Sequence, residues 1–245
     1  MNVEKLSLIG RKKFQYNNDI IINIPTVRQI QDEEYEGTSF WKETNLFTQT
    51  PSGMISELDS VNIDFEEISD YELFIFLFLM NKKVGNPSKC ILFDNFSFWN
   101  LEACEFNGSP CLSDENGKVI IDESVYNDIS KIITMLTGYE KTKKKKFGNA
   151  YAKKKRIEQD YKQKEKIKNQ SEEHSNVLDS IILRLVCNAN FPYDFETIQD
   201  VTIYDLIKSL QQIDKDIEVS DLMQSRLVGN DLSKLPRQQL SRFIL

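Results

Sequence analysis

The stretch Ser69-Asp-Tyr-Glu-Leu-Phe-Ile-Phe-Leu-Phe-Leu-Met80 decides how this sequence folds. Ser69 and Glu72 have the spacing of a capping box, in which each side chain binds the backbone N–H of the other residue at a helix start. The residues from Leu73 to Met80 are all apolar, but this run is far shorter than the roughly 20 residues that a membrane span needs. A helix without a polar face belongs in a core or a permanent interface. We therefore expect a buried helix here.

Further helix signals lie on both sides of this stretch. Thr26 and Gln29 have capping-box spacing, and Thr50 precedes a proline at a first helical position. Asp122 or Ser124 can cap a helix that ends at Gly138. A helix is also expected over Thr38 to Phe47. These signals predict a mainly helical N-terminal half.

Two segments predict β-structure instead. Apolar runs on either side of Asn17-Asn-Asp19 are typical of a β-hairpin near the N-terminus. Between residues 88 and 121, the runs Cys90–Phe93, Phe96–Trp99 and Lys118–Ile121 resemble strands, and Asn107-Gly108 and Asn116-Gly117 are strong tight-turn signals. We expect a small antiparallel β element around 88–121.

The charge of the chain is distributed unevenly. Residues 141–168 hold 12 Lys and one Arg against three acids, which gives this segment a charge of about +10. Because the net charge of the whole chain is −7, the residues outside this segment together carry about −17. Such a segment is polar on all sides and is either an extended helix or disordered. It is either a solvated surface or an electrostatic arm for nucleic acid or an acidic partner. The candidate electrostatic partner-binding residues are Lys143, Lys144, Lys145, Lys146, Lys153, Lys154, Lys155 and Arg156.

The C-terminal part contains two clean apolar stripes at helical spacing. Leu178, Ile181, Ile182, Leu185 and Val186 form the first stripe, and Ile203, Leu206, Ile207, Leu210 and Ile213 form the second. The predicted fold class is therefore α+β and mainly α-helical, with an N-terminal hairpin and a C-terminal helical bundle. We divide the chain into an N-terminal α+β domain (1–138), a basic charged arm (139–170) and a C-terminal helical region (171–245) that packs on the N-terminal domain.

Composition excludes several classes of function. With 9 Gly and 6 Pro in 245 residues, the chain is neither collagen-like nor of low complexity. The four cysteines have no metal-ribbon spacing and are expected as free, small apolar side chains in a reducing compartment. The single histidine, His174, is expected at the surface near a helix start. The N-terminus lacks the pattern of a signal peptide, so we expect a cytoplasmic protein without a membrane segment.

No catalytic motif is present in the sequence. It contains no phosphate loop, no GxGxxG, no GxSxG and no HExxH. Acidic pairs such as Asp64 with Glu66 are expected on the solvated surface, and the D-x-K pattern at Asp160 lies in the charged arm, where we attribute it to chance. We therefore predict no catalytic residue, no metal site, no cofactor and no enzymatic activity.

The order of segments resembles that of small phage proteins of Gram-positive hosts, of the tail assembly chaperone type. The segments that carry the resemblance are Ile24–Ile30 after the hairpin, Ile63–Phe74, Val201–Ile213 and Asp221–Gly229. The resemblance implies a mostly α-helical, non-enzymatic holdase that coats the tape measure protein and helps the tail-tube protein to assemble around it. It transfers no specific binding residue.

If the resemblance holds, the apolar helix stripes and the apolar C-terminal end are the binding surfaces. The candidate apolar partner-binding residues are Leu206, Leu210, Phe243 and Leu245. An exposed apolar groove on a soluble body suits a partner with apolar helix faces. We therefore expect a tail morphogenesis factor of the host cytoplasm with a protein partner.

Two alternatives stay open. The first alternative to a chaperone is a structural tail or baseplate subunit of the virion. The second is an accessory protein that binds nucleic acid through residues 141–168. Abundance in purified particles separates the first alternative from a chaperone, and a steep salt dependence marks the second. The oligomeric state is left open.

Overall fold

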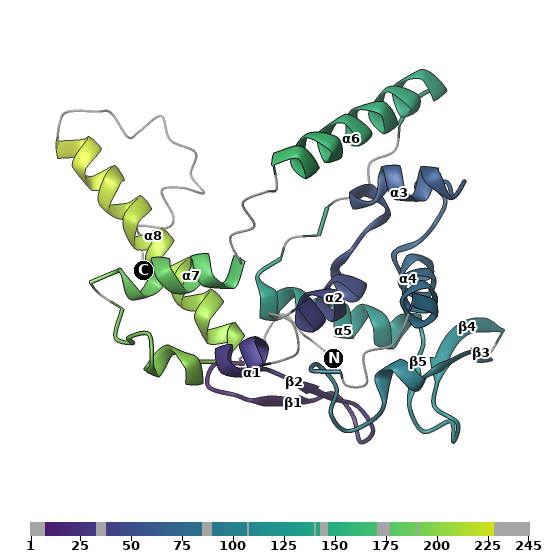
Figure 1. Cartoon of the computed structure of the whole chain (residues 1–245), viewed down its shortest axis with the longest axis horizontal. Coiled ribbons are helices and arrows are strands. Elements are labelled where there is room, and N and C mark those ends of the chain that lie inside the picture. The colour runs from purple at the N-terminus through teal and green to yellow at the C-terminus, as the bar shows by residue number, and fades with distance from the viewer. Residues whose placement is uncertain are drawn as a thin grey trace.

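The fold is mainly helical, with two small antiparallel sheets (Figure 1). The computed structural model describes residues 8–32, 38–84, 90–106, 108–139, 141–142, 147–170, 177–189 and 191–227. The strands are β1 (Lys13–Gln15), β2 (Ile21–Asn23), β3 (Glu102–Phe106), β4 (Ser109–Ser113) and β5 (Ile120–Ile121). The α-helices are α1 (Val27–Asp32), α2 (Thr38–Thr48), α3 (Ile55–Ser60), α4 (Asp70–Val84), α5 (Glu123–Thr137), α6 (Ala150–Gln170), α7 (Val177–Val186) and α8 (Ile203–Leu227). The predicted α+β, mainly α-helical class is confirmed.

The predicted N-terminal hairpin is present. Strands β1 and β2 pair with Phe14 opposite Ile22, and both of these side chains are buried. Asn17 closes the turn, because its Oδ1 accepts the N–H groups of Asp19 and Ile20. The outer edge of β2 is also paired: Asn23 N–H donates to the carbonyl of Leu92 at 2.8 Å. The hairpin therefore binds the loop that follows residue 90 through a backbone hydrogen bond.

Helix α4 packs in two cores, which explains its apolar sequence. Phe74 and Phe78 point into the main core, where the Phe74 ring lies 4.8 Å from that of Tyr126. Leu73 lies in a second, smaller core with Leu58 and Phe65. The expectation of complete burial is wrong for its last apolar turn, since Leu79 and Met80 are 37% and 42% exposed. Leu79 and Met80 belong to neither core.

Three of the predicted helix caps are formed, whereas Thr50 precedes only a 3₁₀ turn (Pro51–Gly53) and its side chain makes no capping hydrogen bond. At α1, Gln29 Oε1 accepts the Thr26 N–H, and Thr26 Oγ1 accepts the Gln29 N–H. Ser69 and Glu72 exchange the same two bonds at α4. Asp122 caps α5 by accepting the Val125 N–H at 2.8 Å. These bonds satisfy backbone donors that have no partner inside the helix, so they fix where each helix begins.

The β element around 88–121 is smaller than its sequence suggests. Strands β3, β4 and β5 form one sheet in that order. The segments Cys90–Phe93 and Phe96–Trp99, predicted as strands, are bends and a 3₁₀ turn, so this part of the prediction is wrong. The reason is the carboxylate of Glu43, which is fully buried and accepts the N–H groups of Ile91 and Leu92. A side chain, and not a neighbouring strand, takes these donors.

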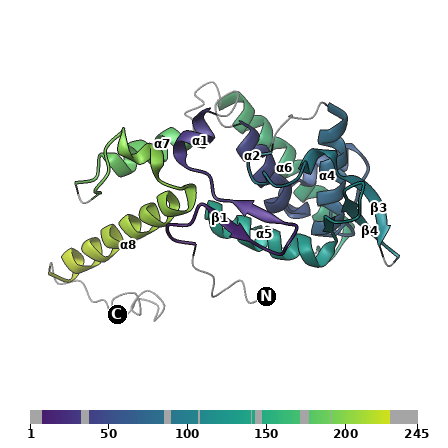
Figure 2. The same ribbon diagram turned by 90° about the horizontal axis from the view of Figure 1, so that it is seen from below.

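The starts of α1 and α8 are joined directly. An isolated bridge pairs Thr26 with Thr202, and Ile203 N–H donates to the carbonyl of Pro25 at 2.8 Å. Helix α8 then packs on α5, where Ile207 lies against Gly138. Seen from below, α7 and α8 lie at one end of the molecule and β3–β4 at the other (Figure 2). Within the described residues, no helix is long and apolar enough to cross a membrane.

Candidate partner-binding site

The basic arm is a helix on residues 150–170, and one side of it is held by acids. Lys153 Nζ lies 2.5 Å from Asp64 Oδ2 and 3.1 Å from Glu66 Oε2. The bond from Lys153 holds the pKa of Asp64 below its ordinary value. The backbone N–H of Phe147, followed by Lys153, lowers the pKa of Glu66. Asp64 and Glu66, expected as freely solvated acids, therefore anchor α6.

A second anchor lies about two turns further along α6. Asp160 is 7% exposed, and its Oδ2 accepts the Ser56 hydroxyl at 2.8 Å and the Ser56 N–H at 3.1 Å. Lys164 lies 2.9 Å from the same oxygen and also pairs with Glu57. Burial raises the pKa of Asp160, but the bonds from Lys164 and Ser56 outweigh it, and the pKa lies below its ordinary value. Asp160 thus has a structural role that its sequence pattern did not reveal.

The other predicted basic residues on α6 are Lys154, Lys155 and Arg156. Lys154 and Lys155 are exposed, and Arg156 is half-buried. Lys162 and Lys166 are exposed further along the helix. Lys143, Lys144, Lys145 and Lys146 lie outside the described residues. Of the predicted electrostatic set, Lys153 is engaged by acids of the same chain, whereas Lys154 and Lys155 face solvent.

The predicted apolar residues of α8 face inward. Leu206 is fully buried in the main core, and Leu210 is half-buried against it. Leu206 is therefore a core residue, and its side chain is not accessible to a partner in this fold. Phe243 and Leu245 lie outside the described residues.

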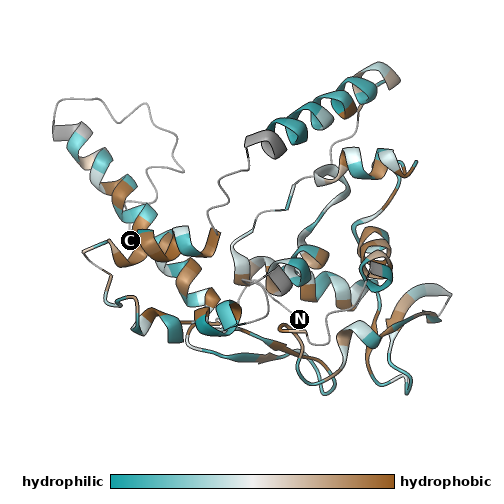
Figure 3. Ribbon diagram, in the orientation of Figure 1, coloured by the Kyte–Doolittle hydropathy of each residue, from teal (hydrophilic) through white to brown (hydrophobic). Residues whose placement is uncertain are grey.

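Helix α7 exposes two apolar residues, Val177 and Leu183, that the predicted stripe does not include, and its outer side also holds the exposed Asp179, Ser180 and Arg184. Leu178, Ile182 and Leu185 are buried, as the stripe predicts. On the outer side, Val177 is 62% exposed and Leu183 is 54% exposed. Figure 3 shows α7 as a largely apolar helix, whereas α6 is largely polar. In the sequence, Val177 and Leu183 are apolar but do not fall at the spacing of the inward stripe, and this mismatch could have indicated that they are exposed.

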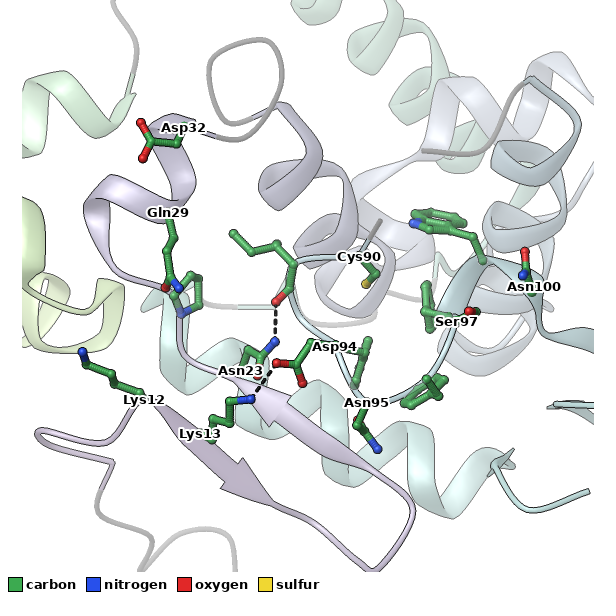
Figure 4. Close-up of a pocket in the computed structure, with 16 residues that line it drawn as sticks. Lys12, Lys13, Asn23, Gln29, Asp32, Cys90, Asp94, Asn95, Ser97 and Asn100 are labelled. Atoms are coloured by element: carbon green, nitrogen blue, oxygen red, sulfur yellow. Dashed lines mark hydrogen bonds and ion pairs between the residues drawn. The ribbon is translucent and has the colours of Figure 1, made fainter. Parts of the chain in front are cut away.

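A groove lies between the β1–β2 hairpin, α1 and the loop of residues 90–100 (Figure 4). Its volume is about 920 Å³. Lys13 pairs with Asp94 at 2.6 Å, and Asn23 Nδ2 donates to the carbonyl of Ile91 at 3.0 Å. Phe93, Phe96, Phe98, Trp99, Gln29, Asn95 and Asn100 also line it. Much of this lining is used within the fold, because Gln29 Oε1 accepts the Thr26 N–H, Asn95 Nδ2 donates to the carbonyl of Asp19, and the rings of Phe93, Phe98 and Trp99 are buried.

The cysteine in this groove is not an activated nucleophile. Burial, followed by the charge of Glu43, raises the pKa of Cys90 well above its ordinary value. A thiol with a raised pKa stays protonated near neutral pH and reacts slowly. The groove is therefore not a site built around an activated thiol.

The described residues contain no group of three or more His, Cys, Asp or Glu side chains placed to hold a metal ion. His174 lies outside them. No protein-family model matches this chain, and no curated protein or solved structure matches it either.

Proposed function

We propose that this protein is a non-enzymatic factor of phage tail morphogenesis, a tail assembly chaperone that binds the tape measure protein or the tail-tube protein. The resemblance in the order of segments motivates the proposal. The observation that carries it is α7, whose outer side exposes Val177 and Leu183 while its inner side is packed.

Two exposed apolar residues on a helix offer contact points to a helical partner. A partner helix that presents its own apolar side removes both surfaces from water and leaves its polar side solvated. Full burial of a leucine contributes about 1.5–3 kcal/mol, so burying the exposed half of Leu183 contributes about 1 kcal/mol. Replacing Leu183 by glutamate removes this contribution and places a charge in the interface, so it weakens binding at least about fivefold.

The experiment is affinity purification of the tagged chain from cells that make it naturally, with nuclease treatment and mass spectrometry. The test variant is Leu183→Glu. The matched control is Leu79→Glu, the same change at an exposed leucine of α4. We expect a tape measure or tail-tube protein with the wild type and the control, and its loss with the test variant. Equal recovery with both variants refutes α7 as the binding surface.

Mass spectrometry of purified particles tests the structural alternative. Recovery of the chain in stoichiometric amounts in purified particles assigns it as a tail or baseplate subunit and overturns the chaperone proposal. A chaperone is recovered with its partner before assembly and is depleted from the particle.

A second candidate function is binding of nucleic acid through the outer side of α6. Lys154, Lys155 and Lys162 are exposed there, while Lys153 and Lys164 are paired with acids. Each phosphate contact adds about 0.7–0.9 to the slope of log affinity against log salt. Replacing the three exposed lysines by glutamine then lowers this slope by about 2 to 3. An unchanged slope removes this candidate.

A further inference from the structure

Two cysteines face each other in the β3–β4 hairpin. Cys104 of β3 and Cys111 of β4 are directly opposite in the register, and their Sγ atoms lie 2.8 Å apart. The hairpin turn at Gly108, which has a φ of +78°, fixes this register. Both side chains therefore extend from the same side of the sheet with their sulfur atoms in contact. A disulfide between them needs a bond of about 2.05 Å, so only a small approach is required.

The two thiols differ in exposure and in their hydrogen bonds. Cys104 is exposed, whereas Cys111 is 1% exposed. The Cys104 thiol donates to Ser113 Oγ at 3.3 Å, which leaves the Cys104 sulfur free to accept the proton of Cys111. Burial, followed by the bond to Cys104, raises the pKa of Cys111 to about 12. Cys104 is thus the thiol that a molecule from solvent meets first, and Cys111 lies behind it.

We propose that Cys104 and Cys111 form a reversible dithiol–disulfide pair that exchanges with small disulfides such as glutathione disulfide. The Cys104 thiolate attacks one sulfur of the small disulfide, which forms a mixed disulfide and releases one thiolate. Cys111 then attacks the Cys104 sulfur, and its proton goes to the second departing thiolate; its raised pKa slows this step, but unlike Cys90 it has its target sulfur in direct contact. In total the protein loses two protons and two electrons, and the small disulfide gains them and becomes two thiols.

The bond fastens the outermost strand of the sheet. Strand β3 is at the edge, pairs with β4 alone in this sheet, and has all five of its residues exposed. Strand β4 is itself held to the body, because Tyr71 Oη donates to the carbonyl of Pro110 in β4 at 2.7 Å and to that of Ile121 in the neighbouring strand β5 at 3.0 Å. Oxidation therefore joins an exposed edge strand covalently to a strand that the core already holds. This inference is independent of the proposed function.

The test uses the full chain in glutathione buffers of increasing oxidised fraction, followed by blocking of free thiols with N-ethylmaleimide. Cleavage after glutamate separates the two cysteines, because Glu105 lies between them. We expect a linked pair of peptides, lighter by two hydrogens, with neither blocking agent nor glutathione on Cys104 or Cys111. Cys187, which is exposed on the segment after α7, is the internal control and takes up glutathione instead.

Two variants make the result decisive. With Cys111→Ser, Cys104 stops at the mixed disulfide and keeps one glutathione. With Cys104→Ser, Cys111 stays reduced, because its thiol is buried. The proposal is overturned if wild-type Cys104 carries glutathione as Cys187 does, or if both cysteines of the pair remain fully available to the blocking agent in oxidising buffer.

Discussion

Substitution of Gly138 by alanine tests the packing of α8 on α5. Gly138 ends α5 with a φ of +64°, and a Cβ there would lie 2.7 Å from Ile207 Cγ2 and 3.1 Å from Gln211 Nε2. The left-handed backbone costs alanine about 1–2 kcal/mol, of which about 0.4–1 kcal/mol is offset by the reduced freedom of the unfolded chain. The contact with the branched, 7% exposed Ile207 adds about 1–3 kcal/mol of overpacking. We expect Gly138→Ala to lower the free energy of unfolding by about 2–4 kcal/mol.

Gly117 provides a matched control. Its φ is +65°, and a Cβ there would meet nothing within 4 Å. Gly117→Ala should therefore cost about 1 kcal/mol, the backbone contribution alone. The assay is urea unfolding followed by circular dichroism. In an Ile207→Ala background, Gly138→Ala should fall to the cost of the control, because the contacting methyl group is gone. Equal costs for the two glycine variants in the wild-type background would refute the reasoning.

The remaining predictions concern α6 and the β3–β5 sheet. Asp160→Ala removes the acceptor of the Ser56 N–H, and a buried donor without an acceptor costs about 1–3 kcal/mol. The Ser56 N–H should therefore exchange hydrogen faster in Asp160→Ala than in Asp160→Asn, because asparagine keeps an acceptor. Tyr71→Phe removes a hydroxyl that two carbonyls accept, which costs about 1 kcal/mol and should lower Tm by about 2–4 °C in calorimetry; an unchanged Tm contradicts the role of these bonds. Because the folded pKa of Asp64 is lowered, its contribution is complete above its unfolded pKa of about 4 and is lost as the pH falls through the folded value. Hydrogen exchange of α6, corrected for intrinsic rates, should therefore rise relative to that of α5 as the pH falls from about 6 to 3. Lys153→Met should flatten this pH dependence. Parallel pH profiles for the wild type and Lys153→Met would exclude the Lys153–Asp64 contact as its source.

The parts of the fold that could be predicted are those with a local cause. The caps at Thr26, Ser69 and Asp122 depend on residues three positions apart, so the sequence is sufficient to locate them. The strands predicted at 90–99 failed because a distant carboxylate, Glu43, takes the N–H groups of the segment. Local propensity contains no information about such a partner.

The candidate surfaces show the same division. The net charge of α6 was visible in the sequence, but the pairing of Lys153 with Asp64 joins residues 89 positions apart. The inward stripe of α7 was predicted, while its outer residue Leu183 was not considered because it lies out of phase. Leu206 satisfied the pattern of an apolar stripe, and a stripe by itself does not distinguish a core contact from a partner contact.

The pairing of Thr26 with Thr202 has a consequence for biosynthesis. The two residues are 176 positions apart, from 26 to 202, so this contact contributes strongly to the contact order of the chain. Helix α1 has six residues, too few to be stable in isolation, and Val27 N–H donates to the carbonyl of Val201. A ribosome that makes the chain from its N-terminus thus releases the first helix long before its partner exists. Until residue 203 has emerged, Val27 and Ile30 of the nascent chain lack the surface that covers them, and this interval is when the chain is most exposed to aggregation.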